Sequence, residues 1–145
     1  MNNLTKMKIL KPANEVFEAF VNPSKIGGFW FSSSSERWEQ GKKITVRYDE
    51  YNARLDINIL QIEVNKKIIF QWGANGEERT VTITFYEPDH MNTLIEVKEE
   101  GFKINENDFV IEILDNKEGW VFMLTCLKAY LEFGITQLRS ALVKD

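Results

Sequence analysis

The segment Gly119-Trp120-Val121-Phe122-Met123-Leu124-Thr125-Cys126-Leu127-Lys128-Ala129-Tyr130-Leu131-Glu132 decides the fold of this chain. On a period of 3.6 residues, one continuous stripe along this segment and the residues after it is apolar. The stripe contains Trp120, Met123, Leu124, Leu127, Leu131, Ile135, Leu138 and Leu142. A second apolar band beside it contains Phe122, Cys126, Ala129 and Phe133. About two thirds of the circumference is then apolar, more than a surface helix needs, so the rest of the chain is expected to wrap around this helix.

The middle of the chain supplies strands that can wrap around it. Several segments alternate between apolar and polar side chains, as strands with one solvated face do. These segments are residues 4–10, 36–40, 42–49, 55–64, 67–72, 79–86 and 93–98. The connections are short, and one of them contains the hairpin signal Asn75-Gly76, so antiparallel neighbours are favoured. Within 55–64 the apolar positions change from odd to even numbers, which predicts a β-bulge near Ile59-Leu60.

Two short helices are expected between the first strand and the next ones. Residues 11–21 have apolar side chains at helical spacing, and Pro12 is compatible with a first helical turn. Ser24 can cap a second helix that ends at Gly27-Gly28, after which the apolar run Phe29-Trp30-Phe31 follows. The serine run at 32–35 is typical of a loop.

The long helix is expected to have neighbours at both of its ends. Residues 105–116 predict a small helix that leads to it, with Asn105 or Asn107 as the cap and a joint at 116–119. The long helix is expected to continue through Gly134, because an interior glycine costs only about 1 kcal/mol. The expected class is therefore α+β: a curved antiparallel sheet of about six to seven strands wrapped around a long C-terminal helix, with two short helices after strand one.

Composition limits the classes of function. With 145 residues, 43% of them hydrophobic, the chain is expected to form a single domain over residues 1–145. Its net charge of −4 offers no positive field to a phosphate backbone, so no nucleic-acid partner is expected. Cys126 is the only cysteine, which excludes an intramolecular disulfide and fits a cytoplasmic location. We see no signal peptide and no apolar run of membrane-spanning length, and expect no membrane span.

The reactive side chains form no recognisable motif for catalysis or metal binding. His90 is the only histidine and lies in a polar turn, whereas a zinc site normally needs several His or Cys ligands. Cys126 has apolar helix neighbours and no cation among them that would lower the pKa of its thiol. Gly27-Gly28 lacks the spacing of a phosphate-binding loop. We therefore expect no cofactor, no metal and no catalytic residue.

A set of short motifs occurs in one order along nearly the whole chain. The motifs are Lys11-Pro12-Ala13, Asn22-Pro23-Ser24-Lys25-Ile26, Phe29-Trp30, Gly41-Lys42, Gln71-Trp72, Val81-Thr82-Ile83, Glu100-Gly101-Phe102, Gly119-Trp120 and Tyr130-Leu131-Glu132. With these motifs the chain resembles the START-like, SRPBCC superfamily and its helix-grip fold, also known from the birch-pollen allergen. Within that superfamily it is similar to the homologues of the activator of the ninety-kilodalton heat-shock protein's ATPase. The resemblance implies a curved sheet closing on the last helix, often around a cavity for an apolar or aromatic small molecule, and it implies no universal catalytic motif.

The implied helix-grip fold would bring many of the aromatic side chains around such a cavity. Each indole N–H needs a hydrogen-bond partner, so a dry core is not the easiest place for a tryptophan, although any single one can simply fill the core. The expected cavity lining is Trp30, Trp38, Tyr48, Phe70, Trp72, Phe102, Trp120, Met123 and Leu127. Arg47, Arg54 and Glu63 would meet a ligand only if a change of phase turned them inward, and are otherwise charges of the outer face.

Two functions of different classes remain open at this point. The first is a non-catalytic module that binds an apolar or amphipathic small molecule, with shape doing most of the selection. The second is a co-chaperone-like domain that binds a protein partner through its outer surface, as monomer or homodimer. An enzyme of the cyclase or hydrolase type would need an acid or base in the pocket, and the sequence offers no obvious one.

Overall fold

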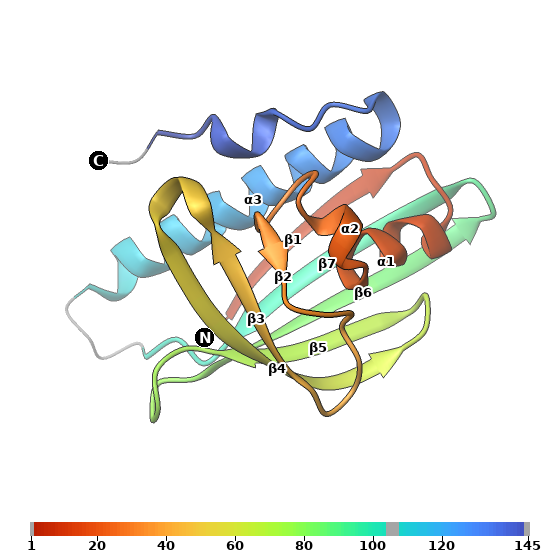
Figure 1. Cartoon of the computed structure of the whole chain (residues 1–145). Helices are drawn as coiled ribbons and strands as arrows, with labels where there is room; N and C mark the ends of the chain where they lie inside the picture. Colours follow the sequence, from red (N-terminus) through yellow and green to blue (C-terminus); the bar gives the residue numbers. More distant parts are fainter. Residues whose placement is uncertain (1, 104–107, 144–145) are drawn as a thin grey trace.

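The computed structural model describes residues 2–103 and 108–143, which form one sheet with helices on one side of it (Figure 1). All strand pairs are antiparallel, and the seven strands lie in the order β1-β7-β6-β5-β4-β3-β2. The strands are β1 (Asn2–Ile9), β2 (Ser33–Ser34), β3 (Lys43–Tyr48), β4 (Ala53–Glu63), β5 (Lys67–Trp72), β6 (Arg79–Asp89) and β7 (Asn92–Glu100). The helices are α1 (Ala13–Val21), α2 (Pro23–Ile26) and α3 (Phe109–Phe133), with 3₁₀ turns η1 (Asp49–Tyr51) and η2 (Leu138–Ser140).

The fold confirms the predicted class. A curved seven-stranded antiparallel sheet faces the 25-residue helix α3, and α1 and α2 follow β1 as expected. Figure 1 shows α3 running beside β1, while α1 lies over β6 and β7 and α2 lies next to α1 and β2. The core is built from the alternating inner positions of the strands and from one face of α3, where Trp120, Met123, Leu124 and Leu127 are buried.

The change of apolar phase in β4 is a β-bulge, as predicted. The pairing of β4 with β5 shifts register between Ile59 and Gln61. Ile59 is buried on one side of the bulge and Ile62 packs against the core on the other, while Leu60 turns outward with 47% of its surface exposed. The bulge therefore keeps the apolar side chains on the inner face where the strand bends.

Two local predictions near β2 are wrong. Residues 36–40 form no strand; the short strand is β2, within the serine run, where Ser33 pairs with Arg47 and Ser34 with Val46. Trp38 is nevertheless buried, because its loop places the backbone N–H on the carbonyl of Val21 (3.1 Å). Burial of a single aromatic side chain from a loop cannot be distinguished from a strand by local pattern alone.

The predicted cap of α2 is also wrong. The N-cap is Asn22, whose side-chain oxygen accepts from the backbone N–H of Ser24 at 2.9 Å. The Asn22 side chain satisfies a free N–H of the first helical turn. Pro23 also lies in this turn, where its missing N–H costs no helical hydrogen bond.

Both ends of the long helix differ from the prediction. α3 passes through residues 116–119 without a joint, so the small helix predicted at 105–116 is the first part of α3. The predicted caps Asn105 and Asn107 lie outside the described residues. The helix ends at Phe133, because Gly134 adopts the left-handed conformation (φ +68°) and forms an αL C-cap: its N–H donates to the carbonyl of Tyr130, and the N–H of Ile135 donates to that of Ala129. The residues after Gly134 therefore run separately, over the outside of α3 and η1.

Side chains of α3 cover the free edge of β1. The ammonium group of Lys117 donates to the carbonyl of Leu4, and that of Lys128 donates to the carbonyl of Lys8 at 2.9 Å. One carboxylate oxygen of Glu132 accepts from the backbone N–H of Leu10 at 2.9 Å. These contacts satisfy backbone groups that an edge strand would otherwise offer to another chain, and they fix α3 along the sheet.

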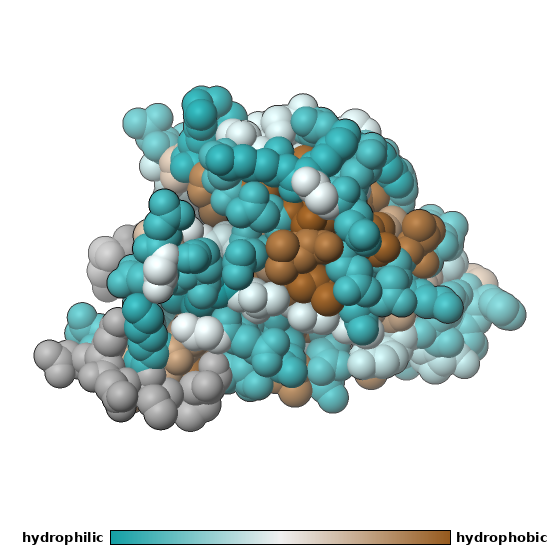
Figure 2. All heavy atoms as spheres, turned by 90° about the horizontal axis from the view of Figure 1, so that it is seen from below, coloured by the Kyte–Doolittle hydropathy of each residue, from teal (hydrophilic) through white to brown (hydrophobic). Residues whose placement is uncertain are grey.

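Some large apolar side chains are exposed on the surface. Figure 2 shows one area of apolar side chains, surrounded by hydrophilic ones, on the face seen from below.

No helix in residues 2–103 and 108–143 combines the length and the hydropathy that a membrane crossing requires.

Candidate functional site

Two adjoining cavities lie between α3, β3 and the loop after α2. Their volumes are about 320 and 190 Å³, and both are lined by Trp30, Tyr48 and Gly119. The larger cavity is also lined by Phe29, Tyr51, Phe122, Met123, Arg139 and Leu142. The smaller one is also lined by Phe31, Leu55, Trp72, Asn116 and Trp120. Both are therefore mainly aromatic and apolar spaces, with a few polar groups at their borders.

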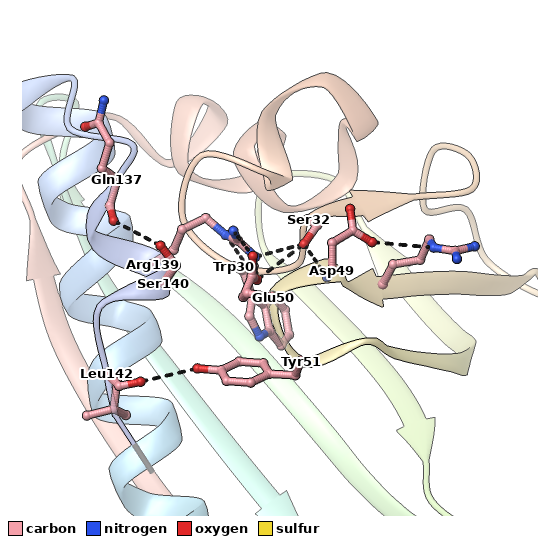
Figure 3. Close-up of polar contacts among 10 residues, drawn as sticks. Trp30, Ser32, Asp49, Glu50, Tyr51, Gln137, Arg139, Ser140 and Leu142 are labelled. Carbon is pink, nitrogen blue, oxygen red and sulfur yellow. Dashed lines mark hydrogen bonds and ion pairs between the residues drawn. The ribbon is translucent and has the colours of Figure 1, made fainter.

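Residues 135–143 contribute Arg139 and Leu142 to the wall of the larger cavity. We call them the C-terminal strap (Figure 3). Arg139 of the strap donates from Nε to the carbonyl of Trp30 at 2.7 Å and forms an ion pair with Glu50 of η1. The hydroxyl of Tyr51 donates to the carbonyl of Leu142 at 3.4 Å. The strap is thus held against η1 and the Trp30 loop by polar contacts, while Leu142 faces the cavity.

Three indoles form the wall of the smaller cavity. The rings of Trp72 on β5 and Trp120 on α3 are stacked, with centroids 5.6 Å apart. Trp30 meets both of them edge-on, at 5.5 Å from Trp120 and 6.4 Å from Trp72. Such offset and edge-on contacts are the favoured arrangements of aromatic rings, so the wall has a defined shape.

A fully buried carboxylate holds two of these indoles in place. Glu99 lies on the inner face of β7 with 0% of its surface exposed. Its Oε1 accepts from Trp120 Nε1 (2.9 Å) and Asn116 Nδ2 (2.8 Å). Its Oε2 accepts from Trp72 Nε1 (3.0 Å) and Arg79 Nε (2.7 Å). Each oxygen thus accepts two hydrogen bonds, which is how a buried charge becomes tolerable in a core.

Gly119 lines both cavities and is exposed. It lies inside α3, where a glycine costs about 1 kcal/mol relative to alanine. A Cβ atom added at this position would meet no atom within 4 Å. Close packing therefore does not demand a glycine here, and the open space beside Gly119 borders both cavities.

Burial also changes the acid–base properties of two groups near the larger cavity. Loss of solvation raises the pKa of the Tyr48 hydroxyl well above its usual range, and the charge of Arg139 only partly opposes this. Burial likewise raises the pKa of the Cys126 thiol from 9.0 to about 11, with Arg139 again opposing. Arg139 is a cation near Cys126 that the helix pattern did not reveal. Both groups keep their protons at neutral pH.

The raised pKa of Cys126 predicts a loss of stability in alkali. The folded chain holds the thiol proton up to pH of about 11, whereas the unfolded chain releases it near 9.0, so ionisation favours unfolding between these values. We expect urea unfolding to show that wild type loses stability relative to Cys126→Ala between pH 8 and pH 10.5. Titrating groups that do not interact with Cys126 contribute equally in both proteins and cancel in this difference. An unchanged difference would contradict the buried, protonated thiol.

The structure brings together five of the side chains expected to line a cavity: Trp30, Tyr48, Trp72, Trp120 and Met123. The other four lie elsewhere. Trp38, Phe70 and Leu127 are in the packed core, and Trp38 donates from Nε1 to the Ser34 hydroxyl. Phe102 lies under the guanidinium of Arg79, 4.5 Å from its Cζ. Their inward positions are filled by close packing with neighbouring rings, such as Phe70 against Trp38 at 5.7 Å, rather than by a cavity.

Several residues of the site were not predicted. Glu99 continues the inner phase of Thr93, Ile95 and Val97, so the alternation itself was a signal for an inward carboxylate. Arg139 had no such signal, because it reaches the cavity through the turn at Gly134. Arg47, Arg54 and Glu63 are exposed on the outer side of the sheet.

The described residues give little support to metal chemistry. Among residues 2–103 and 108–143, no three His, Cys, Asp or Glu side chains are grouped so that they could hold a metal ion. His90 is exposed in the turn between β6 and β7.

Known proteins share this architecture. The family model described as Activator of Hsp90 ATPase homolog 1-like protein matches residues 11–132. Protein SSP2350 from Staphylococcus saprophyticus has a crystal structure that is 53% identical, with a TM-score of 0.83 and coverage of 94% of this chain and 95% of that one. A comparison with curated proteins gave no match.

Two more distant structures show the same fold. The solution structure of the Aha1 dimer from Colwellia psychrerythraea has a TM-score of 0.80 at 15% identity, covering 92% of this chain and 98% of that one. The crystal structure of CalU16 from Micromonospora echinospora has a TM-score of 0.73 at 15% identity, covering 95% of this chain and 78% of that one. Because the family model spans most of the sequence and SSP2350 is similar along nearly its whole length, the chain belongs to the family of Activator of Hsp90 ATPase homolog 1-like proteins.

Proposed function

We propose that this protein binds a small apolar or amphipathic molecule between its sheet and α3 and does not convert it chemically. The observation that carries the proposal is the pair of aromatic-lined cavities, about 320 and 190 Å³, which share Trp30, Tyr48 and Gly119. Their combined size falls within the usual range of ligand pockets, about 300–1,000 Å³. Rigid aromatic walls provide contact area with little loss of side-chain entropy when a ligand binds.

The chemistry of the lining favours binding over catalysis. The Glu99 carboxylate, which contacts the cavity wall, already accepts two hydrogen bonds on each oxygen and would have to give one up before it could take a proton. Burial keeps the Cys126 thiol protonated, which makes it a poor nucleophile. These groups support the shape of the site rather than a reaction in it.

Substitution of Gly119 tests the proposal. We expect Gly119→Leu to reduce the affinity for the neutral probe 2-naphthol by about tenfold or more, because the new side chain fills the space where both cavities meet. Gly119→Ala is the matched control: it adds only a Cβ, should retain binding, and should raise the free energy of unfolding by up to about 1 kcal/mol. Calorimetric titration measures the affinities, and urea unfolding measures the stabilities.

Two results would contradict the proposal. If Gly119→Leu folds and still binds 2-naphthol as wild type does, the probe binds outside the joined cavities. If wild type binds neither 2-naphthol nor larger neutral aromatic probes, the cavities are incidental, and the association with a protein partner that the family name implies becomes the better account.

A further inference from the structure

We infer that Glu50 determines the specificity of this cavity: as the counter-ion of Arg139, it makes the site select neutral ligands over ligands that carry a carboxylate. The inference rests on the proposed binding function and names the charge of the ligand. It concerns Arg139 because this is the one cationic side chain among the described residues that line the two cavities.

The hydrogen-bonding capacity of Arg139 is almost fully used within the protein. A guanidinium has five N–H donors. Nε donates to the Trp30 carbonyl (2.7 Å), Nη1 to Glu50 Oε2 (3.0 Å), and Nη2 to the Ser32 hydroxyl (3.2 Å) and to Glu50 Oε1. At least four donors are therefore engaged. A ligand carboxylate cannot form the two parallel bonds that make arginine a strong anion site.

The position of Glu50 explains why a ligand would not simply replace it. Arg139 lines the larger cavity, whereas Glu50, which belongs to η1, is not among the residues that line it. Ser32 holds Glu50 there through its hydroxyl at 3.3 Å, and the same hydroxyl accepts from the backbone N–H of Asp49 at 2.8 Å. The guanidinium thus presents a neutralised cation to the cavity.

A carboxylate that entered the cavity would meet two costs. It would lose its water shell among aromatic side chains, and it would lie near the negative charge of Glu50 without a free cation in compensation. The hydrogen bond from Arg139 holds the pKa of Glu50 below its usual value, so Glu50 is charged at neutral pH. A neutral ligand meets neither cost.

The experiment compares 2-naphthol with 2-naphthoate, which share one aromatic body and differ in charge at pH 7. For wild type we expect 2-naphthol to bind at least about tenfold more tightly than 2-naphthoate. In Glu50→Gln, the affinity for 2-naphthoate should rise about tenfold relative to that for 2-naphthol, because Arg139 becomes an unneutralised cation. The double variant Glu50→Gln/Arg139→Gln should lose this gain. Calorimetric titration at constant salt measures all affinities.

Asp49→Asn is the matched control. It removes one negative charge at the neighbouring position, but its side chain faces Arg47 (3.7 Å) and not Arg139. It should leave the ratio of the two affinities unchanged. A similar gain for 2-naphthoate in Asp49→Asn would show a general charge effect and overturn the inference.

The remaining outcomes separate this inference from the proposed function. If wild type binds 2-naphthoate as tightly as 2-naphthol, selection by Glu50 is wrong while the binding function stands. If Glu50→Gln changes both affinities by the same factor, Glu50 acts only by holding the strap closed, and the inference is again wrong. If wild type binds neither these two probes nor larger neutral aromatic ones, the proposed function fails and the inference with it.

Discussion

Glu99→Gln is expected to lower the free energy of unfolding by about 3–5 kcal/mol, the usual cost of removing one partner from a buried ion pair. The four donors around Glu99 leave no place for an amide NH₂ group. Whichever way the amide is turned, its nitrogen faces two donors, which are the Trp120 and Asn116 groups or the Trp72 and Arg79 groups. Two buried donors then lose their acceptor, while the guanidinium loses its counter-charge.

Urea unfolding followed by far-UV circular dichroism measures this loss. Glu100→Gln is the control, because Glu100 is the next residue of β7, is exposed, and pairs only loosely with Lys98 at 3.4 Å. It should change stability by less than about 0.5 kcal/mol. Near-UV circular dichroism should also change in Glu99→Gln alone, since Trp72 and Trp120 lose their common acceptor. Equal stability of the two variants would refute the structural role of Glu99.

Leu127→Ala is expected to lower the free energy of unfolding by about 2–5 kcal/mol. Leu127 is 0% exposed on the face of α3 that the sheet grips, in the packed core and outside both cavities. Removing three side-chain carbons there leaves a void that rigid neighbours fill only partly, so lost contacts add to the lost hydrophobic transfer.

Phe133→Ala is the control on the same helix. Phe133 is the last residue of α3 and 71% of its surface is exposed, so its truncation should cost less than about 0.5 kcal/mol. Urea unfolding of both variants locates the gripped face of α3 directly. A larger loss in Phe133→Ala than in Leu127→Ala would mean that the helix is oriented differently.

Much of the fold follows from local patterns. The apolar face of α3 and the alternation in β3, β5 and β6 arise because a side chain's direction depends on the period of its own element. The bulge in β4 was predictable for the same reason: a strand whose apolar positions change phase must insert a residue to keep them inside. Within an element that keeps a single period, the sequence therefore predicted which side chains face the core.

The errors occurred where two local rules compete. After Gly134 the residues Ile135, Leu138 and Leu142 stay in phase with the helix, yet the glycine adopts a left-handed conformation that ends it. Propensity alone makes the interior glycine cheap, about 1 kcal/mol, so the hydrogen bonds of the αL turn and the packing of the strap decide the outcome. This turn is what carries Arg139 back to the cavity.

The sequence by itself determined that an antiparallel sheet must grip the helix that contains Trp120, because that arrangement buries its wide apolar surface. Only the tertiary structure decided which aromatic side chains face empty space and which fill the core, since both kinds have the same inward phase. It also decided that Glu99 is enclosed by donors and that Glu50 neutralises Arg139. Those pairings join residues distant in sequence, and contacts of that kind depend on how the elements pack together rather than on any local period.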